Sequence, residues 1–171
     1  MAGRVQVYTG DGKGKTTAAL GLALRAAGAG LRVFIGQFVK GRWCGEHEAL
    51  AALSERVSVR LFGREKFVCG KPAPEDVSAA KQGLREAGEA LASGQYDVVI
   101  LDEANVAVHL GLFSVDELLA AIEGRAEEVE VVVTGRDAHP RLVERADLVT
   151  EMRCVKHYFD QGQKARRGIE E

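Results

Sequence analysis

Cysteine is scarce in this sequence, and its spacing excludes two common small-protein scaffolds. The chain has three cysteines, Cys44, Cys69 and Cys154. An odd number at wide intervals, with no CxxC pair, indicates neither a disulfide framework nor a zinc knuckle. The pattern is instead typical of scattered reduced thiols in a cytosolic protein, and we expect a cytoplasmic location.

The sequence also lacks a charge excess of either sign and any long apolar run. Its net charge is -2 and its pI is about 6.1, so any anion-binding site must be local. The most apolar early stretch, AALGLALRAAGAGL, is interrupted by Arg25 and is too short to cross a bilayer. The N-terminus has no apolar signal core. We therefore expect neither a membrane nor a nucleic-acid partner.

What the sequence does have is a regular alternation of apolar runs with helical patterns. With 171 residues, of which 46% are apolar, it predicts one compact domain over residues 1–171. Several runs are continuous in Val, Ile and Leu, as in strands that are buried on both faces. The alternation predicts an α/β fold with a mostly parallel sheet of about six strands and helices on both sides. The expected strands are 4–9, 31–38, 57–62, 97–102, 129–135 and 147–152.

Two helices are marked most clearly. Over residues 75–93, apolar side chains recur every three or four positions along one face. Ser114 is followed three residues later by Glu117, which is the capping-box arrangement at the start of a helix. Residues 63–74 and the tail from Arg153 onward fit no regular element. Because ligands bind beyond the carboxyl ends of parallel strands, the loops that follow strands are the places to search for chemistry.

The stretch TGDGKGKT, residues 9–16, follows the first expected strand and opens a helix. It differs from the phosphate-binding pattern GxxxxGK[ST] only at its first position, where Thr9 replaces glycine. Glycines let backbone N–H groups face phosphate oxygens, and the following helix offers its positive end. Lys15 would add a mobile charge, and the Thr16 hydroxyl would be a ligand for a metal ion. The expected nucleotide-binding residues here are Thr9, Gly10, Asp11, Gly12, Lys13, Gly14, Lys15, Thr16 and Thr17.

Two charged residues inside this loop have functions that the phosphate-binding pattern itself does not assign. Lys13 is either a solvated lysine or a second cation for a polyphosphate. Asp11 is unexplained, since an acid that faces a phosphate site is unfavourable unless it points away or caps a backbone N–H.

The stretch DVVILDE, residues 97–103, offers the acidic partner that such a loop requires. A buried strand that ends in Asp102 and Glu103 matches the Walker B pattern, which places carboxylates near a metal ion held by Thr16. Acidic residues after strands are common, so this pair indicates a metal site only because the phosphate-binding loop lies upstream of it. One carboxylate can contact the ion while the other acts through an intervening group. Thr16, Asp102 and Glu103 are therefore the candidate ligands for a metal ion.

Three other stretches carry residues for which the sequence leaves two interpretations open. Arg136 follows the fifth expected strand and either reaches a phosphate or ribose or lies in a surface turn, and His139 lies either beside it or in a surface turn. Trp43 is either a core residue or a flat wall for a planar ligand. The tail mixes basic and aromatic residues, and it is either a solvated segment or a nucleic-acid contact, which the acidity of the chain opposes.

No nucleophile and base accompany these motifs. The sequence has no Ser-His-Asp order and no HExxH, and beyond Asp102 and Glu103 no general base is evident. A reaction that depends on positioning and on stabilising a leaving group would suit such a site.

Five stretches together resemble one family, the ATP:corrinoid adenosyltransferases of cobalamin synthesis and salvage. They are YTGDGKGKTTAALG, GQFVKG, VVILDE, VVVTGRDAH and ADLVTEMRCVKHYFDQGQKARRGIE. The likeness runs from Val5 to Ile169, and Thr9 in the loop together with the tail is specific to that family among P-loop proteins. The resemblance implies a P-loop NTPase-like three-layer sandwich, with ATP and a reduced corrinoid as substrates and Mg²⁺ as cofactor.

The resemblance also implies a mechanism that needs no protein base. Cobalt(I) of the reduced corrinoid attacks the 5′ carbon of ATP, and the whole triphosphate leaves as a cobalt–carbon bond forms. Lys13, Lys15 and Glu103 are then the expected catalytic residues, the last through Mg²⁺ shared with Thr16. The nucleotide is expected to lie reversed relative to ordinary P-loop ATPases, and Arg136 matches the family's TGR arginine. The implied partners are an electron-donor protein that reduces the cobalt and a second copy in a homodimer.

Two features depart from the better-known members of that family. Those have an N-terminal extension that folds over the corrinoid, whereas here the first expected strand begins almost at once. They also have a GFTW segment whose aromatic rings press on the corrin face. This chain instead has FGREKFVCGKP, which offers Phe62 and Phe67 but no tryptophan. Phe67 is the expected corrinoid contact, and a partner subunit can complete the pocket. The competing interpretations are a P-loop phosphotransferase or ATPase, and a nucleotide-binding partner module without turnover.

Overall fold

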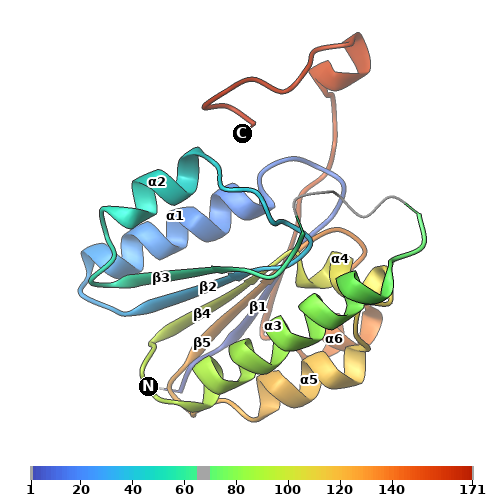
Figure 1. Cartoon of the computed structure of the whole chain (residues 1–171). Helices are drawn as coiled ribbons and strands as arrows, with labels where there is room; N and C mark the ends of the chain where they lie inside the picture. The colour runs from blue at the N-terminus through green and yellow to red at the C-terminus, as the bar shows by residue number, and fades with distance from the viewer. Residues whose placement is uncertain (1, 65–69, 171) are drawn as a thin grey trace.

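The computed structural model describes residues 2–64 and 70–170 and confirms the α/β fold (Figure 1). Six strands form one sheet in the order β3-β2-β4-β5-β1-β6. Every neighbouring pair is parallel, so the sheet expected to be mostly parallel is parallel throughout its described strands. The strands are β1 (Val5–Thr9), β2 (Val33–Gln37), β3 (Val57–Leu61), β4 (Val98–Asp102), β5 (Glu130–Thr134) and β6 (Leu148–Glu151).

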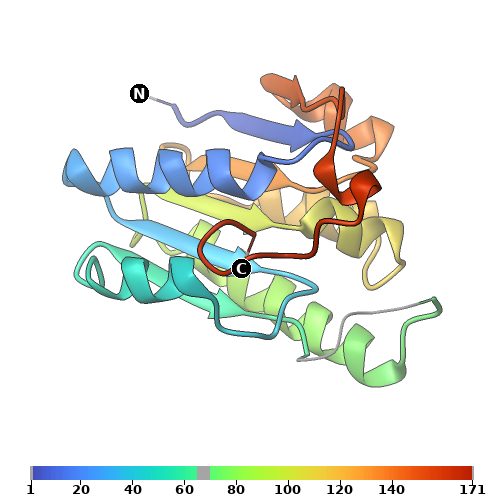
Figure 2. The same cartoon turned by 90° about the horizontal axis from the view of Figure 1, so that it is seen from above.

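Helices cover both faces of this sheet and complete three layers (Figures 1 and 2). One face carries α1 (Lys15–Gly28) and α2 (Gly45–Ala51). The opposite face carries α3 (Pro74–Ala92), α4 (Ala104–His109), α5 (Val115–Glu123) and α6 (Pro140–Arg145). A short 3₁₀ helix, η1 (Tyr158–Gln161), lies in the C-terminal segment. Within residues 2–64 and 70–170, no helix is long and apolar enough to cross a bilayer.

The core is divided by the sheet into two apolar clusters. In β4, Val98 and Ile100 pack toward α1, whereas Val99 and Leu101 pack toward the helices of the other face. This alternation follows from the two-residue period of a strand. Because both faces are covered, the strands read as continuous apolar runs, which is why they could be predicted to within one or two residues.

Helix α3 begins at Pro74, one residue before the predicted start, because proline is favoured in the first turn of a helix. The predicted capping box before α5 is confirmed. The Ser114 hydroxyl accepts a hydrogen bond from the Glu117 N–H at 3.1 Å, and the Glu117 carboxylate accepts one from the Ser114 N–H at 2.7 Å. Helix α2 was not predicted, because its seven residues are too few to show a helical period.

The capping carboxylate should make the stability of the fold depend on pH in the acid range. The Ser114 N–H and Lys81, whose ammonium lies 3.0 Å away, lower the pKa of Glu117 from 4.5 to about 2. A lowered native pKa stabilises the fold above pH 4.5, and this contribution is lost as the pH falls toward about 2.

We expect Glu117→Gln to destabilise the protein at neutral pH by less than about 1 kcal/mol, because the carboxylate is half-exposed and screened. The gap from wild type should close as the pH approaches 2.5, since the amide does not titrate. Urea denaturation at both pH values measures it, with the exposed Glu144→Gln on α6 as control. A gap that stays constant with pH would contradict this account.

Candidate functional site

The phosphate loop connects β1 to α1 with a backbone that only glycine adopts easily. Gly10 has φ of +92°, and a Cβ there would lie 2.4 Å from the Met152 carbonyl oxygen. Gly14 caps α1 with φ of +123°. The Gly12 N–H also donates to the Met152 carbonyl at 2.7 Å, so the segment after β6 supports the loop from one side. The glycines that suggested phosphate binding therefore also permit this close backbone packing.

Lys15, the first residue of α1, points back into the loop. Its Nζ donates to the carbonyl oxygens of Gly10 at 2.6 Å and Gly12 at 2.8 Å, and only 7% of the residue is exposed. Burial lowers the pKa of this ammonium, while the charge of Glu103 opposes the shift. Asp11 is exposed, and its charge also raises the pKa of Lys15. The loop thus holds one cation at its centre.

Asp102 ends β4 as a buried carboxylate that accepts hydrogen bonds at both oxygens. Its Oδ1 accepts from the Thr16 hydroxyl at 2.9 Å and from the Thr134 hydroxyl at 2.6 Å. Its Oδ2 accepts from the Gln37 amide at 2.9 Å. The carboxylate therefore lies against the threonine of the phosphate loop, which is where the paired motifs placed it.

Glu103 lies in a different environment, although it is the next residue. It takes a left-handed conformation with φ of +59°, and its N–H donates to the Thr134 hydroxyl at 3.0 Å. Burial and the neighbouring charge of Asp102 raise the pKa of Glu103, while Lys15 and Arg136 oppose that shift. The two acids are thus divided between a fully bonded carboxylate and a half-buried one beside the cations of the site.

The loop after β5 brings Arg136 to the same edge of the sheet. Arg136 is exposed, and its charge lowers the pKa values of both Lys15 and Glu103. The Thr9 hydroxyl accepts a hydrogen bond from the Ala138 N–H at 3.3 Å and so links this loop to the phosphate loop. That contact gives a structural reason for threonine at the first position of the motif. His139 caps α6, where its Nδ1 accepts from the Arg141 N–H at 3.2 Å.

Backbone strain is concentrated at this edge. The non-glycine residues with positive φ in the described chain are Val39 at 63°, Glu103 at 59° and Asp137 at 54°. They follow β2, β4 and β5 respectively. Such conformations cost about 1–3 kcal/mol each and cluster where the surroundings hold a functional loop in place. Valine at positive φ is especially unfavourable because its side chain is branched at Cβ.

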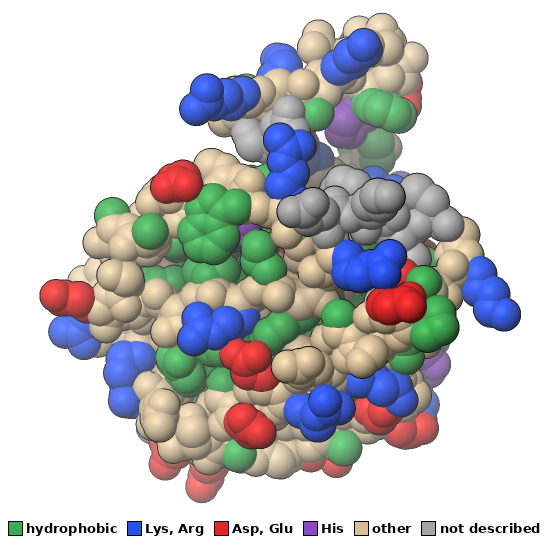
Figure 3. All heavy atoms as spheres, viewed as in Figure 1, with side chains coloured by type: hydrophobic (Ala, Val, Ile, Leu, Met, Phe, Trp, Pro, Cys, Tyr) green, Lys and Arg blue, Asp and Glu red, His purple; other side chains and the backbone are tan. Residues whose placement is uncertain are grey.

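The C-terminal segment leaves β6, rises above the domain and returns toward the phosphate loop (Figures 1 and 2). Lys and Arg side chains project from it (Figure 3). Lys13 donates to the Ile169 carbonyl at 3.1 Å and lies 3.3 Å from the Glu170 carboxylate. Glu170 also accepts from Tyr158, and Arg166 lies 3.1 Å from it. The second cation of the loop is therefore engaged by the tail.

Comparison with known protein families tests the interpretation of these motifs. A family model described as ATP:corrinoid adenosyltransferase BtuR/CobO/CobP matches residues 1–170. The chain belongs to the ATP:corrinoid adenosyltransferase family. Its substrates are accordingly ATP and a corrinoid, and the main interpretation of the sequence is confirmed over the alternatives.

Curated relatives agree with that assignment over almost the whole adenosyltransferase chain. The corrinoid adenosyltransferase of Pseudomonas aeruginosa is 38% identical over 169 residues, which is 98% of this chain and 83% of that protein. The corrinoid adenosyltransferase of Escherichia coli is also 38% identical, covering 98% of this chain and 85% of its own. The corrinoid adenosyltransferase CobA of Salmonella typhimurium is 37% identical with the same coverage.

Sequence reasoning missed two buried polar residues of this adenosyltransferase beside Asp102. Gln37, the last residue of β2, is 1% exposed and bonds to Asp102, and His47 of α2 is 1% exposed and bonds to Gln37. A polar residue in an otherwise apolar strand was the available signal for Gln37. The position of His47 depends on α2, which the sequence did not reveal.

Two aromatic candidates for ligand contact have different outcomes. Phe67 lies outside the described residues, so its expected corrinoid contact stays a prediction. Trp43 is 51% exposed, and its ring lies 4.6 Å from that of His47, centroid to centroid. It is therefore a surface residue that packs against the His47 ring, rather than a core residue.

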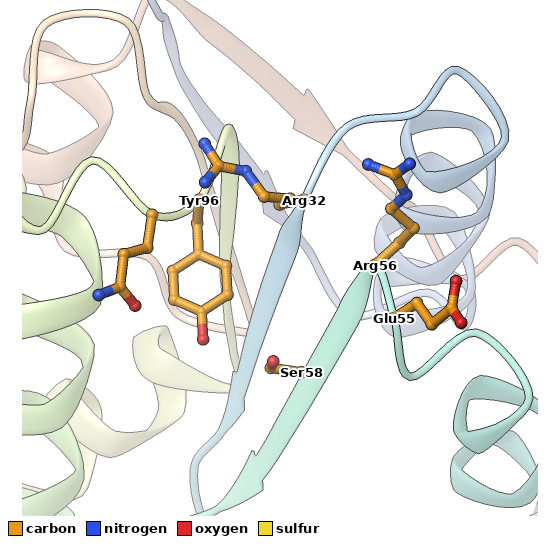
Figure 4. A pocket seen from close by; sticks show the side chains of 6 residues that line it. Arg32, Glu55, Arg56, Ser58 and Tyr96 are labelled. Atoms are coloured by element: carbon orange, nitrogen blue, oxygen red, sulfur yellow. The ribbon is translucent and has the colours of Figure 1, made fainter.

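The described chain also has a pocket away from the phosphate loop. A pocket of about 290 Å³ lies at the amino ends of the strands, where Arg32, Tyr96, Ser58 and Arg56 line it (Figure 4). Asp97 lies 3.4 Å from Arg32, so this charge is already matched. The phosphate loop lies at the opposite, carboxyl edge of the sheet, which is where parallel sheets bind ligands.

Proposed function

We propose that this chain transfers the 5′-deoxyadenosyl group of ATP to the cobalt(I) of a reduced corrinoid in cobalamin biosynthesis or salvage. The cobalt donates an electron pair to C5′, the C5′–O bond breaks, and triphosphate leaves with that bonding pair. The observation that carries the proposal is the enclosed Lys15 ammonium beside Asp102 and Glu103. Such an arrangement stabilises a departing polyanion and requires no proton transfer from the protein.

The residues of the phosphate loop would share the binding of that leaving group. Backbone N–H groups of residues 10–14 and the start of α1 favour phosphate oxygens. Lys15 would exchange its contacts with the Gly10 and Gly12 carbonyls for contacts with phosphate. Thr17 follows Thr16 in the first turn of α1 and is exposed, while Arg136 would contact the nucleotide from the neighbouring loop.

The oxygen donors of Thr16, Glu103 and Asp102 fit Mg²⁺, which prefers hydroxyl and carboxylate ligands. When bound, the ion would neutralise charge that develops on the triphosphate. We propose that Thr16 and the half-buried Glu103 face the ion. Asp102 would act mainly by holding the Thr16 hydroxyl, because both of its oxygens already accept hydrogen bonds.

The tail competes with the nucleotide for Lys13 in this proposal. Glu170 must release the Lys13 ammonium before that charge can meet a phosphate. We expect Glu170→Gln to tighten ATP binding by up to about fivefold, since a partly exposed ion pair contributes little and is screened by solvent. Equilibrium dialysis with labelled ATP measures it, with Glu128→Gln before β5 as control. Weaker binding by Glu170→Gln would mean that the tail assists the nucleotide.

Phe67 is proposed as the corrinoid contact on the basis of its position in the FGREKFVCGKP segment. We expect Phe67→Ala to raise the KM for the corrinoid while the Kd for ATP stays unchanged, because an apolar ring contributes mainly by covering the flat macrocycle. Steady-state kinetics with the corrinoid varied, and ATP dialysis alongside, separate these effects. Equal losses in both would indicate a packing role instead.

Three further properties are proposed. A homodimer is supported by β6, an edge strand whose Leu148 and Val149 are 45% and 41% exposed. Light scattering tests this oligomeric state.

A cytoplasmic location is supported by the free thiols Cys44 and Cys154, and cell fractionation tests it. An electron-donor protein follows from the need for cobalt(I), and omission of candidate reductases from a coupled assay tests it.

The direct experiment is incubation of the protein with Mg²⁺, ATP and a chemically reduced corrinoid, followed by mass spectrometry. An adenosylcorrinoid product is expected. Bound ATP with no adenosylated product under reducing conditions would refute the proposed function.

A further inference from the structure

A chain of buried hydrogen bonds runs from helix α2 to the acid of the phosphate site. His47 bonds through Nε2 to the Gln37 Oε1, and the Gln37 Nε2 donates to Asp102 at 2.9 Å. His47, Gln37 and Asp102 are 1%, 1% and 2% exposed. Neither the phosphate-loop motif nor the acidic motif includes His47 or Gln37. Their contacts nevertheless end on the carboxylate that holds Thr16.

In this row of hydrogen bonds, the contact at Cys44 determines which group donates and which accepts in every other bond. The Cys44 backbone N–H can only donate, and it donates to the His47 Nδ1 at 2.8 Å. The ring proton of His47 must therefore lie on Nε2 and point at the Gln37 oxygen. That contact leaves the amide nitrogen of Gln37 to face Asp102, where only an acceptor fits. A neutral ring agrees with its burial, which lowers the pKa of His47.

Several contacts fix the position of helix α2, and with it the orientation of the His47 ring. Lys40 forms an ion pair with Glu46 in its first turn, and Trp43 covers the outer face of the His47 ring. The strained Val39 and the close approach of Gly63, whose Cβ would lie 2.4 Å from the Lys40 nitrogen, set the path of the preceding loop. A rotated Gln37 amide would place two N–H donors face to face at His47, so the alternative is unfavourable.

We infer that His47 and Gln37 are positioning residues, which orient Asp102 so that its Oδ1 stays directed at the Thr16 hydroxyl. The inference rests on the proposed role of Asp102 beside a divalent ion. Residues that orient such groups typically change metal affinity about 10- to 100-fold when they are replaced. Cys44, Glu46 and His47 also lie close enough to hold a metal ion. Both ring nitrogens of His47 are already occupied, which argues against that use.

Two substitutions of His47 separate positioning from simple support of α2. His47→Asn keeps an acceptor near the Nδ1 position for the Cys44 N–H but cannot reach Gln37. His47→Gln places an amide N–H near the Nε2 position and can still donate to Gln37, but loses the acceptor for Cys44. A role confined to capping α2 predicts that only the glutamine variant is impaired, whereas positioning of Asp102 predicts the reverse.

The readout is the gain in ATP affinity that Mn²⁺ provides, measured without corrinoid so that no turnover occurs. The Kd for ATP is determined in EDTA and in excess Mn²⁺, and the ratio of the two isolates the metal-linked part. We expect His47→Asn to reduce this ratio about 10-fold, with the Kd in EDTA unchanged. His47→Gln should keep a ratio near that of wild type. Gln37→Met repeats the test if His47→Asn does not fold.

Asp102→Ala distinguishes failure of this inference from failure of the proposed metal site. If Asp102→Ala lowers the ratio and neither His47→Asn nor Gln37→Met does, the positioning role is wrong and the metal site stands. If Asp102→Ala leaves the ratio unchanged, the metal role of Asp102 and the inference both fail. A ratio lowered equally in His47→Asn and His47→Gln would indicate general damage to α2 and also overturn the inference.

Discussion

Lys15→Ala is expected to lower the rate of adenosyl transfer at least ~100-fold, the usual effect of removing a charged transition-state contact. Lys15 is enclosed by the phosphate loop, with its ammonium 2.6 Å from the Gly10 carbonyl and 2.8 Å from that of Gly12. Lys13, the other lysine of the loop, does not duplicate it, because its ammonium is exposed and engaged by Glu170. The loss should fall mainly on kcat, since negative charge grows on the triphosphate as the C5′–O bond breaks.

The matched control is Lys81→Ala, which removes a lysine of α3 that pairs with Glu117 far from the phosphate loop. It should leave turnover unchanged. Melting temperatures of both variants show whether the fold is retained. A Lys15→Ala protein that is folded and turns over at a rate near that of wild type would contradict the role given to this ammonium.

Asp102→Asn is expected to reduce transfer about 100-fold, at the upper end for a residue that orients a metal ligand. Either orientation of the new amide leaves a mismatch: its nitrogen faces the Gln37 N–H, which now donates to Oδ2 at 2.9 Å, or it faces the Thr16 and Thr134 hydroxyls, which now donate to Oδ1. Gln37 cannot rotate away from this clash without facing the His47 N–H. The variant therefore loses both the negative charge beside Thr16 and a matched hydrogen bond, and an unmatched buried polar group also costs about 1–3 kcal/mol of stability.

A second substitution separates these two losses. In Asp102→Asn combined with Gln37→Glu, the new carboxylate can accept from both His47 and the amide at 102, so the hydrogen bonds match again. Stability to urea should recover, whereas activity should stay low because the charge now lies farther from Thr16. Recovery of activity along with stability would show that Asp102 acts through hydrogen bonding alone.

The sequence predicted most of the sheet because burial on both faces leaves continuous apolar runs. It also predicted the phosphate loop and the acid pair, since both motifs are local and their chemistry follows from residue type. Thr9 was recognised as a family feature, and its contact with the Ala138 N–H now gives it a physical role. The observed ends of the strands differ from the predicted ends by at most two residues.

What could not be predicted depends on contacts between distant segments. The bond from His47 to Gln37 requires α2, whose seven residues are stabilised by tertiary packing and carry little helical signal of their own. The pairing of Lys13 with Glu170 joins residues 157 positions apart. The different environments of Asp102 and Glu103 come from the left-handed backbone conformation at Glu103. That conformation cannot be predicted from the residue type.

The central claim is that the phosphate loop holds a triphosphate that leaves intact. The measurement is ³¹P NMR of the reaction of the protein with Mg²⁺, ATP and cobalt(I) corrinoid, with wild type and Lys15→Ala compared. We predict that free triphosphate accumulates in step with adenosylcorrinoid and that Lys15→Ala suppresses both. Formation of ADP and phosphate in place of triphosphate would contradict the account and assign the site to phosphoryl transfer.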